Sequence, residues 1–118
     1  MSLDISLHQN AEYYTEVFST NITHNLGKMA KAVICFSLGN NHDVITLYHI
    51  LWLGSGQSAK VIAPMLEVGL NELKECRELY EEYNPENGWG SYEGLIKHTE
   101  ELLEACLDFP ETTLYCHR

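Results

Sequence analysis

The chain has 118 residues, of which 45% are hydrophobic and 20% charged, as expected for a single folded domain over residues 1–118. Its net charge of -10 repels the phosphates of DNA and RNA, so we expect no direct nucleic-acid binding. No apolar run reaches the roughly 18 residues of a membrane span, and the first residues lack a secretion signal, so the sequence predicts a cytoplasmic protein with no membrane contact.

The first third of the chain predicts one strand and two helices after a polar start. Residues 12–20 are rich in aromatic and β-branched side chains, which favour a strand. Thr23 suits the N-cap of a helix, because apolar residues recur at helical spacing over 26–34. Residues 37–41 break this pattern, and a second helix is expected from about residue 43 to residue 52.

The longest apolar stripe runs over residues 59–83 and predicts one long helix. Pro64 lies inside the stripe and has no N–H to donate, so we expect a kink or a separate first turn there. Gly69 lies on the stripe itself, where the missing side chain would let another helix approach closely.

The end of the chain predicts a helix followed by a strand. Ser91 suits the N-cap of a helix that ends at Phe109, and residues 112–118 alternate as a strand does. The strand over 12–20 is its expected partner. The sequence therefore predicts an α+β, mostly helical fold of about four helices packed with a small sheet formed by the N- and C-terminal strands. Exposed edges of such a sheet favour a homodimer.

The four cysteines include no C-x-x-C pair, so the sequence gives no indication of a zinc site or of another cofactor. Buried free thiols are the interpretation that suits a reducing cytoplasm, whereas disulfides would require secretion.

Two motifs predict a binding site. They are ITHNLGKMA over residues 22–30 and NGWGSYE over residues 87–93, and each places polar or aromatic side chains beside glycine where a helix begins. Helix starts present unpaired N–H groups and a partial positive charge, which suit anionic or polar ligands. The predicted ligand-binding residues are Thr23, His24, Asn25, Lys28, Asn87, Trp89, Tyr92 and Arg118.

The same two motifs resemble a family of small uncharacterised proteins from bacteria and their phages. The likeness runs from about residue 15 to the end and includes Leu102, Ala105, Cys106, Pro110 and Arg118. The resemblance implies an accessory protein of a phage or mobile element, with no activity to transfer. The chain departs from the family between residues 36 and 58, where it is longer and a lid would lie, and at His117.

Structural explanations compete with the binding interpretation. Thr23 and Asn25 could serve only to cap the helix while His24 packs beside the sheet. Trp89 could stack on a ligand or fill the base of the core, and Arg118 could clamp an anion or extend into solvent as a terminal residue.

Three functions follow from these patterns. The leading hypothesis is a non-enzymatic protein that binds a small polar, nucleotide-like ligand, because both motifs lie where a helix is expected to begin. The sequence has no nucleophile elbow and no phosphate-binding loop motif. The first alternative is an acidic interaction module that inhibits a host defence protein. The second is a small metal-dependent phosphohydrolase that uses His24, His42, Asp43 and Asp108. No residue is predicted to be catalytic or to bind a metal under the leading hypothesis.

Overall fold

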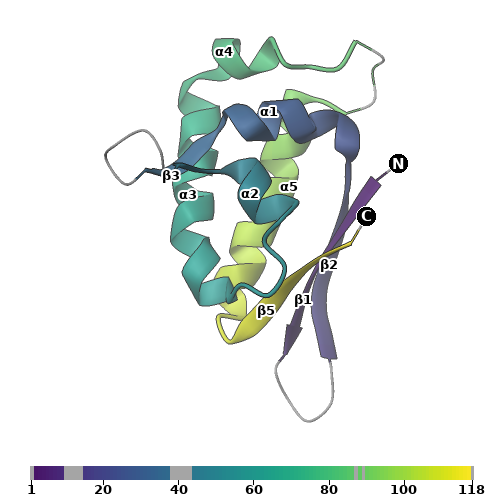
Figure 1. Cartoon of the computed structure of the whole chain (residues 1–118), viewed down its shortest axis with the longest axis vertical. Helices are drawn as coiled ribbons and strands as arrows, with labels where there is room; N and C mark the ends of the chain where they lie inside the picture. The colour runs from purple at the N-terminus through teal and green to yellow at the C-terminus, as the bar shows by residue number, and fades with distance from the viewer. Residues whose placement is uncertain (1, 10–14, 38–43, 87, 89, 118) are drawn as a thin grey trace.

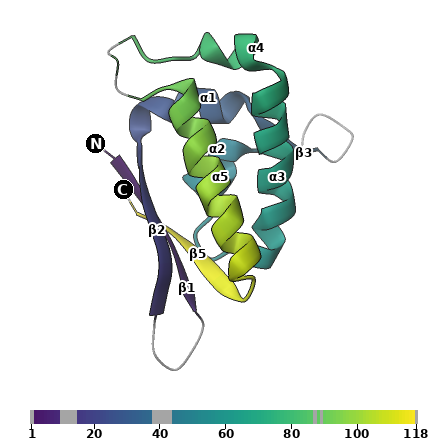
Figure 2. The same cartoon turned by 180° about the vertical axis from the view of Figure 1, so that it is seen from behind.

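A three-stranded antiparallel sheet with a layer of helices against one face makes up most of the molecule (Figure 1 and Figure 2). The computed structural model describes residues 2–9, 15–37, 44–86, 88 and 90–117. In chain order the elements are β1 (Ser2–Gln9), β2 (Thr15–Thr23), the 3-10 helix η1 (His24–Leu26), α1 (Gly27–Ala32), β3 (Ile34–Ser37), β4 (Val44–Thr46), α2 (Leu47–Leu51), α3 (Ala59–Glu75), α4 (Arg77–Glu81), α5 (Tyr92–Asp108) and β5 (Thr112–His117). The predicted α+β class, with helices beside a small sheet of terminal strands, is confirmed.

The central strand of this sheet is β1, which the sequence analysis treats as a polar start. The strand order is β2-β1-β5, so the C-terminal strand pairs with β1 and not with the strand predicted over residues 12–20. Leu3, Ile5 and Leu7 are fully buried and alternate with polar residues, because successive side chains of a strand point to opposite faces. That alternation of period two marks β1 as a strand.

The outer edge of β5 is covered by the Ser55–Ser58 segment. Gly56 N–H donates to the Leu114 carbonyl at 2.8 Å, and Leu114 N–H donates to the Gln57 carbonyl at 2.8 Å. Cys116 N–H donates to Ser55 Oγ at 2.7 Å. This edge is therefore already paired within the chain. The homodimer predicted from open edges of this sheet now depends on the edge of β2, and it stays a prediction.

The middle of the chain differs most from the predicted helices. The first helix is short, and β3 begins at Ile34, the last residue of the helix predicted over 26–34. β4 replaces the start of the helix predicted over 43–52, and the two strands form an antiparallel hairpin. All three residues of β4 are β-branched, which favours extended backbone. Only α2 remains of the predicted second helix.

The predicted long helix divides into α3 and α4. The helix continues through Pro64 and ends instead at Cys76, whose φ of -115° and ψ of 44° are not helical. Tyr80 of α4 donates its hydroxyl hydrogen to Glu72 of α3 at 3.0 Å, which ties α4 back to the preceding helix.

Gly69 makes the close approach that the sequence predicts, but to a strand rather than to a helix. A Cβ at this position would lie 2.6 Å from Cys35 Sγ of β3. The hairpin of β3 and β4 therefore packs directly on α3.

The last helix, α5, agrees with its prediction. Ser91 Oγ accepts a hydrogen bond from Gly94 N–H at 3.1 Å, which confirms the cap. Leu95, Leu102 and Cys106 face the core that α5 shares with α3 and the sheet. Among the described helices, none combines the length and the apolar character that crossing a bilayer would demand.

Candidate functional site

The structure brings His24, Asn25 and Lys28 together in one cavity, which we call the polar cleft. It has a volume of about 780 Å³ and lies between the η1–α1 segment and the turn that follows α4. Its lining is His24, Asn25, Lys28, Glu82, Tyr83, Asn84, Pro85 and Glu86. Residues more than 50 positions apart in the sequence therefore meet here.

Close packing of Gly90 holds the two motifs side by side. Gly90 has a φ of 96°, and a Cβ there would lie 2.7 Å from Thr23 Cγ2 and 3.0 Å from Leu26 Cγ. Only glycine fits both the backbone conformation and the space. Asn84 Oδ1 also accepts a hydrogen bond from Tyr92 N–H at 2.7 Å, which ties the cleft turn to the start of α5.

The helix start at the first motif is shorter than predicted. Thr23 is the expected N-cap, and its Oγ1 accepts a hydrogen bond from Asn25 N–H at 3.4 Å. However, η1 has three residues and α1 has six, so few peptide dipoles align behind this end. The cleft therefore depends on side chains more than on a helix dipole.

A buried tryptophan fixes the orientation of His24. Trp52 is 5% exposed, and its Nε1–H donates to His24 Nδ1 at 2.9 Å. Because Nδ1 accepts this bond, the proton of the neutral imidazole lies on Nε2. Tyr48 stacks on Trp52 with ring centroids 5.2 Å apart, and Lys31 Nζ lies 4.5 Å from the Tyr48 centroid. His24 is thus held by a packed aromatic pair that the sequence analysis did not connect with it.

The charges that line the polar cleft are mixed. Lys28 supplies one positive charge, whereas Glu82 and Glu86 supply two negative charges. The cleft therefore offers both donors and acceptors, and it does not concentrate positive charge as a polyphosphate site would.

Tyr92 lies in the core instead of lining the cleft. It is 1% exposed, and its hydroxyl donates to the Leu73 carbonyl. Burial raises the pKa of this hydroxyl. The Tyr92 side chain therefore ties the start of α5, which follows the turn after α4, to α3. The predicted residues Asn87, Trp89 and Arg118 lie outside the described residues.

The hypothesis of a phosphohydrolase finds no assembled site in the described part of the chain. There, no three His, Cys, Asp or Glu side chains are grouped to hold a metal ion. His42 and Asp43 lie outside the described residues. His24 lies near the start of α5, because Gly90 packs against Thr23 and Leu26. Asp108 is the last residue of α5, and a helix of 17 residues is roughly 25 Å long. His24 and Asp108 therefore lie near opposite ends of this helix.

A Ser–His–Glu group on the outer face of the sheet is not arranged as a catalytic triad. Ser6 Oγ lies 2.8 Å from His8 Nε2, and Glu16 Oε1 lies 3.9 Å from the same nitrogen. In a triad the carboxylate orients the ring through the other nitrogen.

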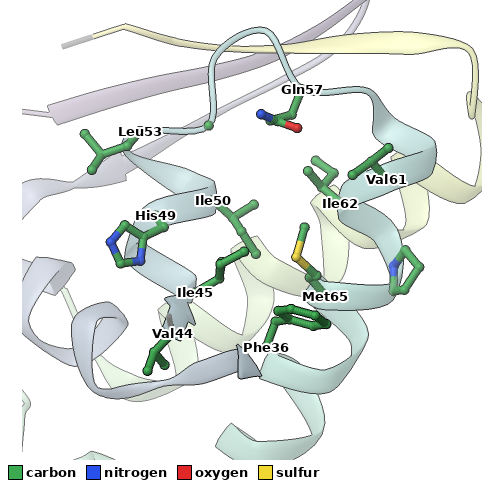
Figure 3. A pocket seen from close by; sticks show the side chains of 12 residues that line it. Phe36, Val44, Ile45, His49, Ile50, Leu53, Gln57, Val61, Ile62 and Met65 are labelled. Carbon is green, nitrogen blue, oxygen red and sulfur yellow. The ribbon is translucent and has the colours of Figure 1, made fainter. Parts of the chain in front are cut away.

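A second cavity, which we call the apolar groove, was missed by the sequence analysis. It has a volume of about 680 Å³ and lies between α2, α3 and the hairpin of β3 and β4. In Figure 3, Ile50 and Met65 lie on opposite sides of the groove, with Phe36 at one end and Gln57 at the other. In the sequence these residues resemble ordinary core residues. The structure distinguishes them, because Phe36, Leu53 and Val61 are exposed.

A comparison with models of known protein families, with curated proteins and with solved structures finds no match to this chain. The side chains that line the two cavities therefore carry the functional inference.

Proposed function

We propose that the protein binds a small polar ligand of the nucleoside type in the polar cleft, without catalysing a reaction. The observation that carries this proposal is the hydrogen bond from buried Trp52 to His24. This bond fixes the ring orientation of a half-buried histidine that lines the cleft. A preorganised donor of this kind lowers the entropy lost when a ligand binds.

The lining favours a ligand with an aromatic ring and with both donors and acceptors. Tyr83 is 40% exposed and offers a face on which a base can stack. His24 and Lys28 donate hydrogen bonds, whereas Glu82 and Glu86 accept them. The two carboxylates disfavour additional phosphates, so a nucleoside suits the cleft better than its triphosphate.

Isothermal titration with the four ribonucleosides, their monophosphates and their triphosphates tests the proposal. We expect at least one nucleoside to bind, and its triphosphate to bind about tenfold more weakly at low salt because of Glu82 and Glu86. Raising the salt concentration narrows this gap, since screening weakens charge repulsion.

Two pairs of variants locate the binding. Tyr83→Ala and Lys28→Met should weaken binding, whereas Phe109→Ala and Lys60→Met should not. Phe109 is 37% exposed, close to the 40% of Tyr83, and neither control residue lines the polar cleft. Titrations without heat for any ligand, or binding that neither cleft variant weakens, would contradict the proposal.

The acidic surface supports a second candidate, an interaction with a basic protein. Lys60, Lys74 and Arg77 already form ion pairs with Glu111, Glu100 and Glu93. The excess of carboxylates over these cations suits a basic partner surface, as an inhibitor of a host defence protein would need. A partner recovered from host lysate at low salt and released at high salt is the expected result, and recovery that salt does not change argues against it.

The resemblance of the two motifs supports an accessory role in a phage or mobile element.

The four cysteines are free, as expected of a protein in the reducing cytoplasm, where we place it. Burial raises the pKa of both Cys35 and Cys106 to about 12, which keeps these thiols protonated at neutral pH and unreactive.

A further inference from the structure

The apolar groove exposes large hydrophobic side chains around a buried floor. Ile50 and Ile62 form the floor at 3% and 0% exposure, whereas Phe36, Leu53 and Val61 stand at the rim at 44%, 55% and 53%. Single exposed apolar residues are common, but several around one hollow are typical of a binding site.

The described lining of the groove offers neutral hydrogen-bonding groups. None of its described lining residues is Asp, Glu, Lys or Arg, and its polar side chains are His49 and Gln57. Thr46 N–H donates to His49 Nδ1 at 3.0 Å, so the proton of the neutral ring lies on Nε2. Gln57 lies at one end of the groove (Figure 3). A ligand here therefore meets an apolar interior and neutral polar groups at its margin.

The dimensions of the groove suit a small molecule. Its α3 wall runs from Val61 to Met65, which is roughly 6 Å of helix. A docked amphipathic helix uses anchors from i to i+7, which spans about 10 Å. The volume of about 680 Å³ falls within the range of small-molecule sites.

Charge argues against two other occupants. A second copy would carry a net charge of -10 like the first, so charge repulsion opposes its docking in the groove. An anionic amphiphile meets the same repulsion, and none of the described lining residues offers it a Lys or Arg side chain. An uncharged ligand avoids both penalties.

We propose that the apolar groove binds an uncharged small molecule that has a hydrocarbon chain and one hydrogen-bonding head group. The chain lies over Ile50 and Ile62, and the head group bonds to Gln57 or to His49 Nε2–H. This site is separate from the polar cleft, because the two cavities share no lining residue.

Fluorescence of the neutral probe N-phenyl-1-naphthylamine with the full chain tests the proposal. We expect the emission to rise on binding and to fall again when decanol displaces the probe. Decanoate and decylamine carry the same chain with a negative or a positive head group, and each should displace the probe less well than decanol. Displacement that is strongest with decylamine would show general attraction to an acidic surface and overturn the proposal.

Two valines on α3 provide a matched pair of variants. Val61 lines the groove at 53% exposure, and Val68 lies outside it at 51% exposure. Val61→Gln should weaken probe binding about tenfold, whereas Val68→Gln should leave it unchanged. Both side chains are half exposed, so neither change should unfold the chain, and equal melting temperatures check this. Equal probe binding by the two variants overturns the proposal.

Sedimentation of the unmodified chain separates a ligand site from an interface. We expect no association that Val61→Gln disrupts. A dimer that dissociates on Val61→Gln but persists with Val68→Gln would assign the groove to a second copy and overturn the small-molecule proposal.

Discussion

The polar cleft and the apolar groove have similar volumes, about 780 and 680 Å³, but they are assembled in different ways. The cleft is formed by two short segments, each compact in sequence, that meet through Gly90. The groove is formed by side chains spread from Phe36 to Met65 on a hairpin and two helices. The first therefore depends on a turn conformation, and the second on how the hairpin packs against α3.

Because of this difference, we expect the two cavities to respond to different changes. A substitution that moves the turn before α5 should disturb the cleft and leave the groove intact. A substitution that separates β3 from α3 should do the reverse. Ligand binding at each site, measured with a nucleoside and with the neutral probe, reports on the two independently.

The largest effect is expected at Gly90. Gly90→Ala places a Cβ 2.7 Å from Thr23 Cγ2 in a residue with a φ of 96°. The steric overlap and the backbone strain together should lower the free energy of unfolding by about 2–4 kcal/mol. Gly88→Ala is the control, because its φ is 74° but no described atom lies within 4 Å of the added Cβ. It should cost only about 1–2 kcal/mol. Urea unfolding measures both, and equal costs would contradict the close packing of the motifs.

The next effect concerns the support of His24. Trp52→Phe keeps an aromatic ring against Tyr48 but removes the N–H that donates to His24 Nδ1. Loss of a part-buried hydrogen bond and of the indole volume should lower the free energy of unfolding by about 1–3 kcal/mol. Nucleoside binding should weaken as well, while probe binding in the groove persists. Tyr48→Phe retains the stacking and serves as the control, and equal nucleoside affinity in the two variants would contradict the role of the hydrogen bond.

An effect of similar size is expected where the hairpin meets α3. Gly69→Ala puts a Cβ 2.6 Å from Cys35 Sγ and should lower the free energy of unfolding by about 1–3 kcal/mol. Cys35→Ala removes the opposing sulfur, so the double variant should recover part of this loss. Probe binding in the groove should fall in the single variant and the nucleoside site should not change. Strictly additive effects of the two substitutions would contradict direct contact between them.

Local patterns in the sequence predict a regular element well where a capping residue marks its start. Ser91 and the stripe behind it predict α5, and Thr23 is predicted as a cap, because capping is a property of a few neighbouring residues. The segment over 44–46 lies inside one predicted helix, and the segment over 34–37 begins at the last residue of another, since so few apolar residues fit either period. Their pairing with one another is a tertiary effect.

The candidate sites show the same limit. The motif residues His24, Asn25 and Lys28 are predicted and do meet in one cleft, because unusual polar residues stand out in a sequence. The hydrogen bond from Trp52 spans 28 positions, and no local pattern indicates it. No sequence pattern indicates the lining of the apolar groove, since the same apolar residue types occur both in a core and on a surface.

The smallest effect is a pH dependence at His98 of α5, where this helix meets β2. Burial lowers the pKa of His98 from its ordinary value of 6.5, and Thr20 Oγ1 of β2 lies 2.9 Å from its Nδ1. The unfolded chain therefore binds this proton more readily, so the contribution of His98 to stability is complete above pH 6.5 and is lost as the pH falls through the lowered value. His98→Gln should flatten the decline of urea-unfolding free energy below pH 6.5. A decline that is identical in the variant and the unmodified chain would place the proton uptake at other residues and contradict this role of His98.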